Sequence, residues 1–244
     1  MTKRSEAARV GTHAGTMTDT WTLIDTETDG LYAPIHVIDV AAQKFSGLTP
    51  VGEPFQVLIN HGVRIPLDAT AVHGYTTDFI RKHGIDPATA YRGLRSYIGD
   101  DPIVSHNVSF DWDRVLMPEW SRLGEAPIGQ RGFCALLLSR RALPEHPTHR
   151  LDYLRDFHGL ACSRPHSALG DVESTADLLT RIIFPRLTSI GFGTVDGIHK
   201  FVSLRPVLRC KCLIEGLDYE EEAQRIRAER TRKSPFPRRF GKGW

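Results

Sequence analysis

Apolar residues in the first quarter of the chain gather in short runs bounded by turn-forming residues. These runs are rich in β-branched and aromatic side chains, which favour strands, and they cover residues 21–25, 35–45 and 54–59. Turn residues follow each run, at Asp29–Gly30, Thr49–Pro50 and Asn60–Gly62. Three strands in succession with short links predict an antiparallel meander that begins near Thr20.

From residue 86 the apolar residues lie three and four positions apart, which is the spacing of helices. The pattern predicts helices over residues 86–97, from 109 onward, and over 133–141, 151–158 and 168–183. A short apolar run at 102–104 predicts a buried strand. We expect Pro118 to break or kink the second helix and Pro185 to end the last one. Strands followed by helices interleaved with a strand predict an α/β layered domain with a mixed sheet.

Beyond Pro185 the periodic signals weaken. Residues 188–197 are rich in glycine, residues 201–208 fit a strand, and residues 219–230 fit a charged, solvated helix. We therefore expect a flexible lead over residues 1–19 and a folded domain over 20–185. A C-terminal extension over 186–244, whose function is open, would follow.

Charge is divided unevenly along the chain. Residues 225–244 hold eight Lys or Arg and one acid, a net charge of +7, which leaves −5 for the rest of a chain whose total is +2. The basic tail fits contact with nucleic-acid phosphates and equally fits a solvated end. An acidic body suits nucleic acid only where its carboxylates hold metal ions.

Several classes of protein are disfavoured by the sequence. The chain has no apolar run long enough to cross a bilayer, and its first twenty residues lack the apolar stretch of a signal peptide. The cysteines, Cys134, Cys162, Cys210 and Cys212, show no C-x2-C zinc spacing. Free thiols are typical of a reducing compartment, so we expect a cytoplasmic protein without a membrane partner.

Two carboxylates stand at the end of the first predicted strand. Side chains alternate along a strand, so Asp25 and Glu27 point to the same face. A pair of exposed acids in a hairpin would need no partner, but the apolar residues that lead into Asp25 indicate a buried strand. Buried carboxylates need a positive partner, and this pair therefore predicts a metal site.

Two further segments carry acids near the starts of predicted helices. Asp111, in HNVSFD at residues 106–111, follows the buried strand at 102–104, where open α/β sheets place their sites. In HSALGD at residues 166–171, His166 lies in a loop and Asp171 in the first or second turn of the next helix. Each segment alone fits an ordinary helix-terminal acid or a surface histidine.

Together these segments favour a site for divalent metal ions. Their carboxylates are hard oxygen ligands, which select Mg²⁺ or Mn²⁺ over zinc, and they come from Asp25, Glu27, Asp111 and Asp171. Two such ions about 4 Å apart suit phosphodiester hydrolysis, since one activates water and the other stabilises the leaving oxygen. His166 adds an imidazole, a group that can take up and release a proton.

The three segments DTETDGL, HNVSFD and HSALGD resemble, in order and spacing, the exonuclease motifs of the DnaQ-like (DEDD) superfamily. The likeness is to the subclass whose third motif carries histidine, and within it to the exonuclease X branch. Residues 72–76, 133–141 and 151–154 fit other landmarks of the superfamily. The resemblance covers residues 20–185 and implies an exonuclease domain there. The implied fold is ribonuclease H-like, with a five-stranded mixed sheet flanked by helices.

The resemblance also implies roles for single residues. Asp25, Glu27 and Asp171 would hold one Mg²⁺ or Mn²⁺ ion, and Asp25 and Asp111 would reach a second. His166 would be the general base. The residues expected to bind the terminal nucleotide are Thr28, Gly30, Leu31, His73, Thr76, Asn107 and Phe110. The superfamily commonly has glutamate where this chain has Asp39, and we interpret Asp39 as structural.

Several functions are consistent with this resemblance. We expect a metal-dependent 3′→5′ exonuclease that releases nucleoside monophosphates from single-stranded DNA. Trimming of RNA ends stays open, because the catalytic residues do not report on a 2′-hydroxyl. A proofreading-type subunit also stays open, in which residues 186–244 dock on a polymerase or another protein partner.

Overall fold

A five-stranded mixed sheet forms the centre of the computed structural model, which describes residues 19–124 and 130–233. The strands are β1 (Thr20–Thr28), β2 (Val37–Ser46), β3 (Thr49–Leu58), β4 (Pro102–Ser105) and β5 (Gln130–Cys134). Their order across the sheet is β3-β2-β1-β4-β5. β1, β2 and β3 pair antiparallel, as the predicted meander requires, whereas β4 and β5 run parallel to β1. The predicted five-stranded mixed sheet is therefore confirmed, with β1 in the middle.

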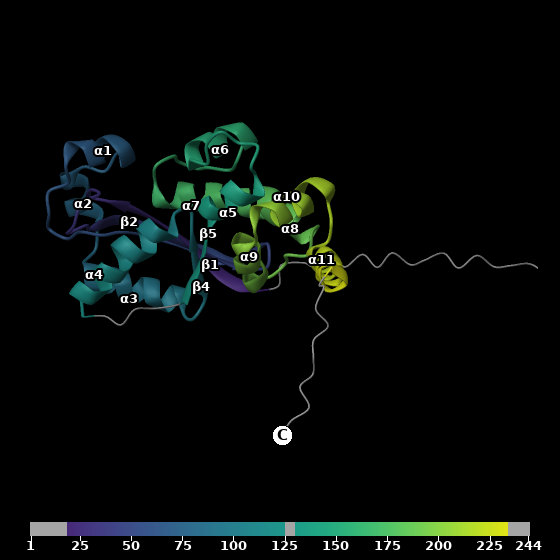
Figure 1. Cartoon of the computed structure of the whole chain (residues 1–244). Helices are drawn as coiled ribbons and strands as arrows, with labels where there is room; N and C mark the ends of the chain where they lie inside the picture. The colour runs from purple at the N-terminus through teal and green to yellow at the C-terminus, as the bar shows by residue number, and fades with distance from the viewer. Residues whose placement is uncertain (1–18, 125–129, 234–244) are drawn as a thin grey trace, which may run out of the picture.

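Helices cover both faces of this sheet (Figure 1). The lower layer in Figure 1 contains α3 (Pro87–Ile98), the π-helix η1 (Ser109–Leu116) and α4 (Met117–Arg122). The upper layer contains α5 (Ala135–Ala142), α6 (Leu151–His158) and α7 (Ala168–Asp177), and α7 continues through η2 (Leu178–Ile183) and α8 (Phe184–Thr188). The short helices α1 (Leu67–His73) and α2 (Thr77–His83) follow β3.

Alternation along β1 divides the apolar core into two parts. Trp21 and Leu23 pack with residues of α5, α7 and α8, whereas Ile24 packs with residues of α3, η1 and α4. Successive side chains of a strand point to opposite faces of the sheet. Asp25 and Glu27 therefore point toward the α7 layer, on the same face as predicted, and Thr26 points toward the η1 layer.

The two prolines expected to interrupt helices lie in the same setting. Pro118 lies in the first turn of α4, directly after the π-helix η1 ends, and the chain stays helical from Ser109 to Arg122, so Pro118 does not break the helical path. Pro185 does not end the last helix, because it lies in the first turn of α8, where its missing N–H is not needed. The helical path from Ala168 continues to Thr188.

Two predicted elements are wrong. Residues 133–141 do not form one helix, because β5 ends at Cys134 and α5 begins at the next residue. Gly132 allows β5 to approach β4, since a Cβ there would lie 2.6 Å from the carbonyl oxygen of Ile103. Residues 201–208 do not form a strand, because they belong to α9 (Val195–Ser203) and α10 (Pro206–Glu215). Proline is favoured in the first turn of a helix, and this explains the start of α10.

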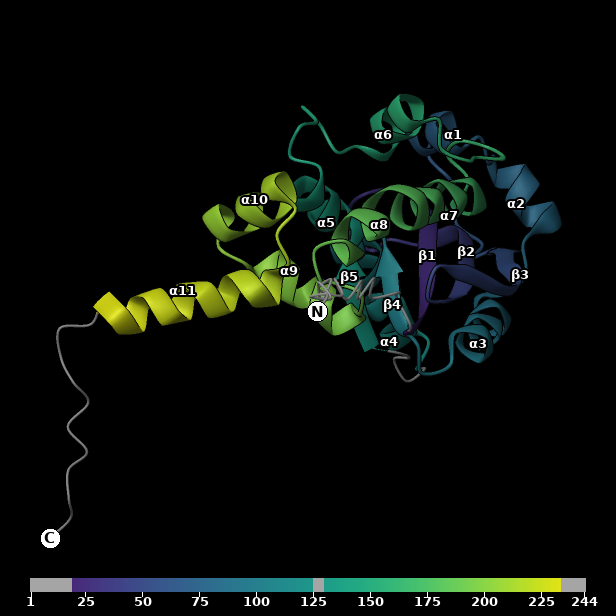
Figure 2. The same cartoon turned by 90° about the vertical axis from the view of Figure 1, so that its right-hand side faces the viewer.

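The described part of the C-terminal extension packs against the same core as β1. Phe192, Phe201 and Cys212 are buried in the cluster that contains Trp21. α9, α10 and α11 (Tyr219–Lys233) gather at one end of the molecule, and α11 projects away from the sheet (Figure 2). α11 confirms the helix predicted at 219–230, whereas the tail from 234 and the lead at 1–18 lie outside the described residues. Within the described ranges, the helices are too short or too polar to cross a bilayer.

Candidate metal centre and adjoining clefts

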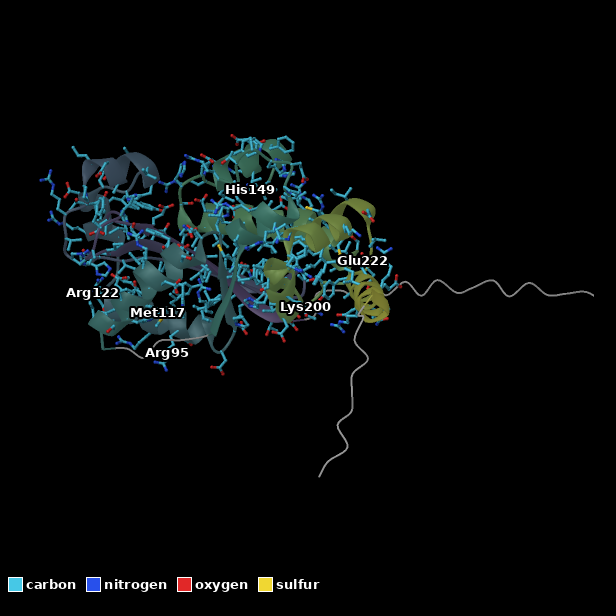
Figure 3. All side chains as sticks on the ribbon, in the orientation of Figure 1. Arg95, Met117, Arg122, His149, Lys200 and Glu222 are labelled. Atoms are coloured by element: carbon cyan, nitrogen blue, oxygen red, sulfur yellow. The ribbon has the colours of Figure 1, made fainter. Side chains whose placement is uncertain are left out.

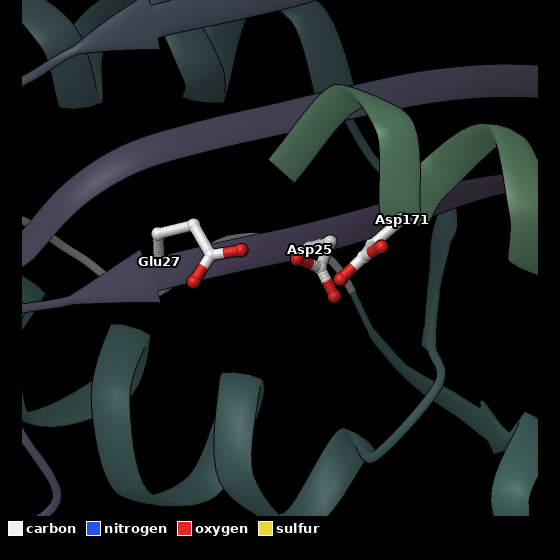
Figure 4. Close-up of side chains that lie close together, drawn as sticks. All are labelled: Asp25, Glu27 and Asp171. Atoms are coloured by element: carbon white, nitrogen blue, oxygen red, sulfur yellow. The ribbon is translucent and has the colours of Figure 1, made fainter. Parts of the chain in front are cut away.

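Three carboxylates from distant parts of the sequence meet beside β1 (Figure 4). Asp25 and Glu27 leave the same face of β1, and Asp171 reaches them from the first turn of α7. One oxygen from each carboxylate lies within 4.8 Å of those from the other two, which allows one cation to contact all three. We call these residues the acid cluster. The structure thus brings together three of the four predicted acids.

Burial and mutual repulsion raise the pKa values within the acid cluster. Burial is the largest cause at Asp25, whose pKa lies well above its usual value, and the charge of Asp111 adds to it. Burial and the charge of Asp171 raise the pKa of Glu27 to about 8. Among the described residues, no donor hydrogen-bonds the carboxylate of Asp25 or Glu27. Converging acids without protein donors fit a hard divalent cation.

The fourth acid, Asp111, approaches from the opposite layer of helices. It lies in the first turn of η1, where it is 4% exposed and accepts hydrogen bonds from Thr26 Oγ1 at 2.7 Å and Ser105 Oγ at 2.9 Å. Burial raises its pKa to about 6, and these hydroxyls oppose the rise. Asp111 is not part of the acid cluster. Two hydroxyl donors, which the sequence analysis missed, hold it beside the cluster.

A tight turn ahead of α7 holds His166 next to Asp171. His166 is exposed and has a φ of 55°, a left-handed conformation that is uncommon outside glycine. Ser167 Oγ accepts from the N–H of Gly170 at 3.2 Å and donates to the carbonyl of Arg164 at 2.9 Å. A Cβ on Gly170 would overlap that carbonyl. Gly170 therefore lets the turn fold back over the helix, a requirement that the motif alone did not reveal.

A buried acid on β2 fixes the same turn to the sheet. Asp39 pairs with Glu27 in the β1–β2 register and is fully buried. It accepts hydrogen bonds from Tyr75 Oη at 2.8 Å, Gln56 Nε2 at 3.2 Å and the N–H of Ala168 at 3.2 Å. Because Ala168 is the first residue of α7, Asp39 positions the helix that completes the acid cluster. These contacts agree with a structural role for Asp39.

One arginine lies directly on the acid cluster. Arg155 Nη1, from α6, lies 3.1 Å from Asp171 Oδ1, and the two side chains are only 12% and 17% exposed. Burial raises the pKa of Asp171, and the Arg155 guanidinium opposes that rise. The sequence did not indicate Arg155, because the spacing of α6 does not show which of its residues face α7.

An open cleft of about 570 Å³ adjoins the Glu27 end of the acid cluster. We call it the apolar cleft. It is lined by five of the residues predicted to bind a nucleotide: Thr28, Gly30, Leu31, His73 and Phe110. Leu31 and Tyr32 are 59% and 88% exposed at its edge. His73 Nδ1 accepts from the N–H of Tyr75 at 3.0 Å, and His73 Nε2 is buried. Apolar walls with a few polar groups suit a base and a sugar.

A second cleft of about 330 Å³ adjoins the Asp171 end of the acid cluster. We call it the basic cleft, because three arginines line it, Arg140, Arg150 and Arg155, together with His166. His149, also in its wall, lies near α6 in the upper part of the molecule (Figure 3). The two clefts share no lining residue and meet at the acid cluster.

Two residues predicted to bind the nucleotide lie outside the apolar cleft. Asn107 lines the basic cleft instead. Thr76 is not among the residues that line either cleft, and its Oγ1 accepts from the N–H of Phe79 at 3.1 Å to cap α2. Thr76 therefore begins α2, directly after the short turn that follows His73.

The sheet order and the acid cluster are those of a nuclease that uses divalent metal ions. The chain matches the family model RNase_T, described as exonuclease, over residues 22–179. It therefore belongs to the RNase_T exonuclease family, within the DnaQ-like superfamily that the three motifs indicated. This family needs divalent metal ions, and the acid cluster supplies ligands of the right kind.

Individual relatives are similar over about two-thirds of the chain. DNA polymerase III PolC-type from Bacillus subtilis is 32% identical over 169 residues, which are 68% of this chain and 11% of that protein. The chain thus spans about a tenth of the length of that relative. Exonuclease X in complex with 5′ overhanging duplex DNA superposes with a TM-score of 0.52 and 25% identity, over 66% of this chain and 90% of that one. E. coli exonuclease I in complex with a dT13 oligonucleotide shares the fold, with a TM-score of 0.60 and 21% identity, over 70% of this chain and 42% of that one.

Proposed function

We propose that this protein is a metal-dependent 3′→5′ exonuclease that releases nucleoside 5′-monophosphates from single-stranded DNA ends. The acid cluster carries the proposal, because Asp25, Glu27 and Asp171 converge within 4.8 Å beside a cleft with room for a nucleotide. The solved complexes of exonuclease I with dT13 and of exonuclease X with overhanging duplex DNA support DNA as the substrate.

Each site residue has a role in the proposed hydrolysis. Two bound Mg²⁺ or Mn²⁺ ions would supply an activated water and neutralise charge on the phosphate. The acid cluster would hold one ion, and Asp25 with Asp111 would hold the other. His166, which is exposed next to Asp171, would take the proton of the attacking water. The apolar cleft would bind the terminal nucleoside and leave its 5′-phosphate at the acid cluster.

A strand-shortening assay tests this function. Purified protein is incubated with 5′-labelled single-stranded DNA or RNA of equal sequence, in Mg²⁺, Mn²⁺ or EDTA. We expect a metal-dependent ladder that shortens from the 3′ end of DNA and is absent with Asp25→Ala. A stronger ladder on RNA would replace the proposed substrate class. No ladder on either strand would contradict an exonuclease.

A groove between α10 and α11 favours an additional role in docking a protein partner. The groove has a volume of about 470 Å³ and combines apolar with basic residues: Leu208, Tyr219, Ala223, Ile226, Arg205, Lys211 and Arg227. The groove lies at the end of the molecule where Figure 3 labels Lys200 and Glu222. Such a surface suits an acidic segment of a partner, and the similarity to a polymerase supports the idea.

Truncation after residue 185 is a poor test of docking, because it removes Phe192 and Phe201 from the main core. Ile226→Asp in the groove is the sharper variant. Retained strand shortening with lost binding to a purified polymerase would support docking, whereas unchanged binding would contradict it.

A further inference from the structure

The two clefts that meet at the acid cluster differ in charge. Among the described residues that line the apolar cleft, there are three acids and no lysine or arginine; the acids are Glu27, Asp29 and Asp68. The basic cleft has three arginines against two acids, Asp152 and Asp171. A nucleic-acid strand that crosses the acid cluster therefore finds cationic side chains on the Asp171 side.

The three arginines of the basic cleft differ in their contacts. Arg155 is paired with Asp171 at 3.1 Å, and Arg150 is paired with Asp152 at 2.7 Å. Arg140 lies in the last turn of α5 and is exposed. Within the ranges that the structure describes, Arg140 makes no hydrogen bond or ion pair. Its guanidinium group is therefore the one in this cleft whose charge no carboxylate already neutralises.

The buried histidine of the basic cleft adds no positive charge to it. His106 lines the cleft, and burial lowers its pKa to about 4, so its ring is neutral at physiological pH. His106 Nδ1 is buried and has no hydrogen-bond partner among the described residues. His149 Nε2 lies 3.0 Å from the carbonyl oxygen of Leu143, which fixes the loop between α5 and α6.

We propose that the basic cleft binds the phosphate on the 5′ side of the penultimate nucleotide, with Arg140 as its main contact. This assignment rests on the proposed exonuclease activity. When the terminal nucleoside fills the apolar cleft, its 5′-phosphate lies at the acid cluster, and the strand continues past Asp171. The next phosphate along the strand then reaches the basic cleft, where a guanidinium group can bind it through two hydrogen bonds.

Two trinucleotides that differ at one linkage test this assignment. Both have a native phosphodiester next to the 3′-terminal nucleotide, and in one of them the neighbouring linkage is an uncharged methylphosphonate. The first cleavage is measured as kcat/KM in Mn²⁺ for the wild type, Arg140→Gln and Arg140→Lys. Arg92→Gln is the matched control, because Arg92 is an exposed arginine of α3 in the opposite layer.

We expect Arg140→Gln and the methylphosphonate each to lower kcat/KM about 10- to 100-fold, the usual effect of losing a hydrogen-bonded contact between charged groups. Combined, they should lower it no further than either one alone, because both remove the same contact. Arg140→Lys should recover part of the loss, and Arg92→Gln should match the wild type. An equal loss with Arg140→Gln on both trinucleotides would overturn the assignment.

A small ester separates this assignment from the proposed exonuclease activity. The 4-nitrophenyl ester of thymidine 5′-monophosphate has the terminal nucleoside and a scissile phosphate, but no neighbouring linkage. If the wild type hydrolyses this ester with metal and cuts both trinucleotides equally well, only the assignment of the basic cleft fails. If the wild type hydrolyses neither the ester nor the trinucleotides, the exonuclease proposal fails with it.

Discussion

Two buried acidic sites in this molecule differ in the hydrogen bonds that their carboxylates receive. Glu119 of α4, which is 1% exposed, accepts a hydrogen bond from the Tyr91 hydroxyl and lies 3.1 Å from His61 Nε2. Asp25 and Glu27 receive no hydrogen bond from the residues that the structure describes. Burial raises the pKa of Glu119 and that of Glu27 to the same value, about 8. A raised pKa alone therefore does not identify a functional site in this protein. The better indicator is that acids converge and receive no hydrogen bond from protein donors, as Asp25 and Glu27 do.

Removal of one acid from the acid cluster should lower the exonuclease activity more than any other change considered below. Asp25→Ala should lower kcat/KM for strand shortening at least about 10³-fold, because a lost metal ligand removes several kcal/mol of transition-state stabilisation. The metal-free variant should melt at the same temperature as the wild type or higher, since repulsion among the acids falls. Activity gels and thermal melts in EDTA measure both effects. Near-normal activity across a metal titration would contradict the assignment.

Loss of the proposed base should have the next largest effect. His166→Ala should slow turnover about 10²- to 10⁴-fold, the usual contribution of a general base. Mn²⁺ affinity, measured by calorimetry without substrate, should stay within a few-fold of the wild type, because His166 is not a member of the acid cluster. A matching loss of Mn²⁺ affinity would make His166 a ligand instead.

Glu119 should affect stability and leave the chemistry unchanged. Its pKa of about 8 in the folded state lies above the usual glutamate value of 4.5, so its contribution to stability is full below about pH 4.5 and is lost as the pH rises through 8. Glu119→Gln cannot ionise, so the unfolding free energy of the wild type should fall relative to the variant by roughly 4 kcal/mol between pH 5 and 9. Urea unfolding measures this difference, and parallel pH profiles would show that Glu119 does not hold a proton.

Mg²⁺ binding should stabilise the folded protein by the smallest amount of these effects. This stabilisation should increase with pH, whereas the contribution of Glu119 decreases with pH. Protons compete with Mg²⁺ for the acids, and the pKa values of about 8 for Glu27 and about 6 for Asp111 mean that more of the site is ionised at pH 8 than at pH 6. Tenfold tighter binding contributes about 1.4 kcal/mol, or roughly 3–6 °C in melting temperature. Thermal melts should show a larger Mg²⁺ shift at pH 8, and no shift with Asp25→Ala. Equal shifts at both pH values would argue against these acids as the ligands.

Local patterns located most of the site, but they did not reveal the contacts between layers. Strand alternation placed Asp25 and Glu27 on one face, and the spacing of the motifs located Asp171. The contacts of Asp111 with hydroxyl groups and of Arg155 with Asp171 depend on how helices pack onto the sheet, which no local period specifies. The same reason explains the missed strand β5, because residues 130–134 become a strand only by pairing with β4.

The region after Pro185 was the least predictable part of the fold. The run from Phe201 to Leu208 is apolar enough to resemble a strand, but Pro206 begins a helix there, and the helices are held by burial against a distant core. The position of the apolar cleft could be predicted more closely from the sequence, because Thr28, Gly30 and Leu31 come directly after the acids of β1.

The start of the folded region is joined to the C-terminal extension by a hydrogen bond, because Asp19 Oδ2, just before β1, accepts from the N–H of Val195 at 2.6 Å. β1 leaves the ribosome before α7 does, yet it carries two acids of a centre that is incomplete until Asp171 has been made. At about 5–20 residues per second, the interval between them lasts on the order of ten seconds. The nascent chain therefore has no complete metal centre until Asp171 has been synthesised, and the proposed nuclease site cannot form before then.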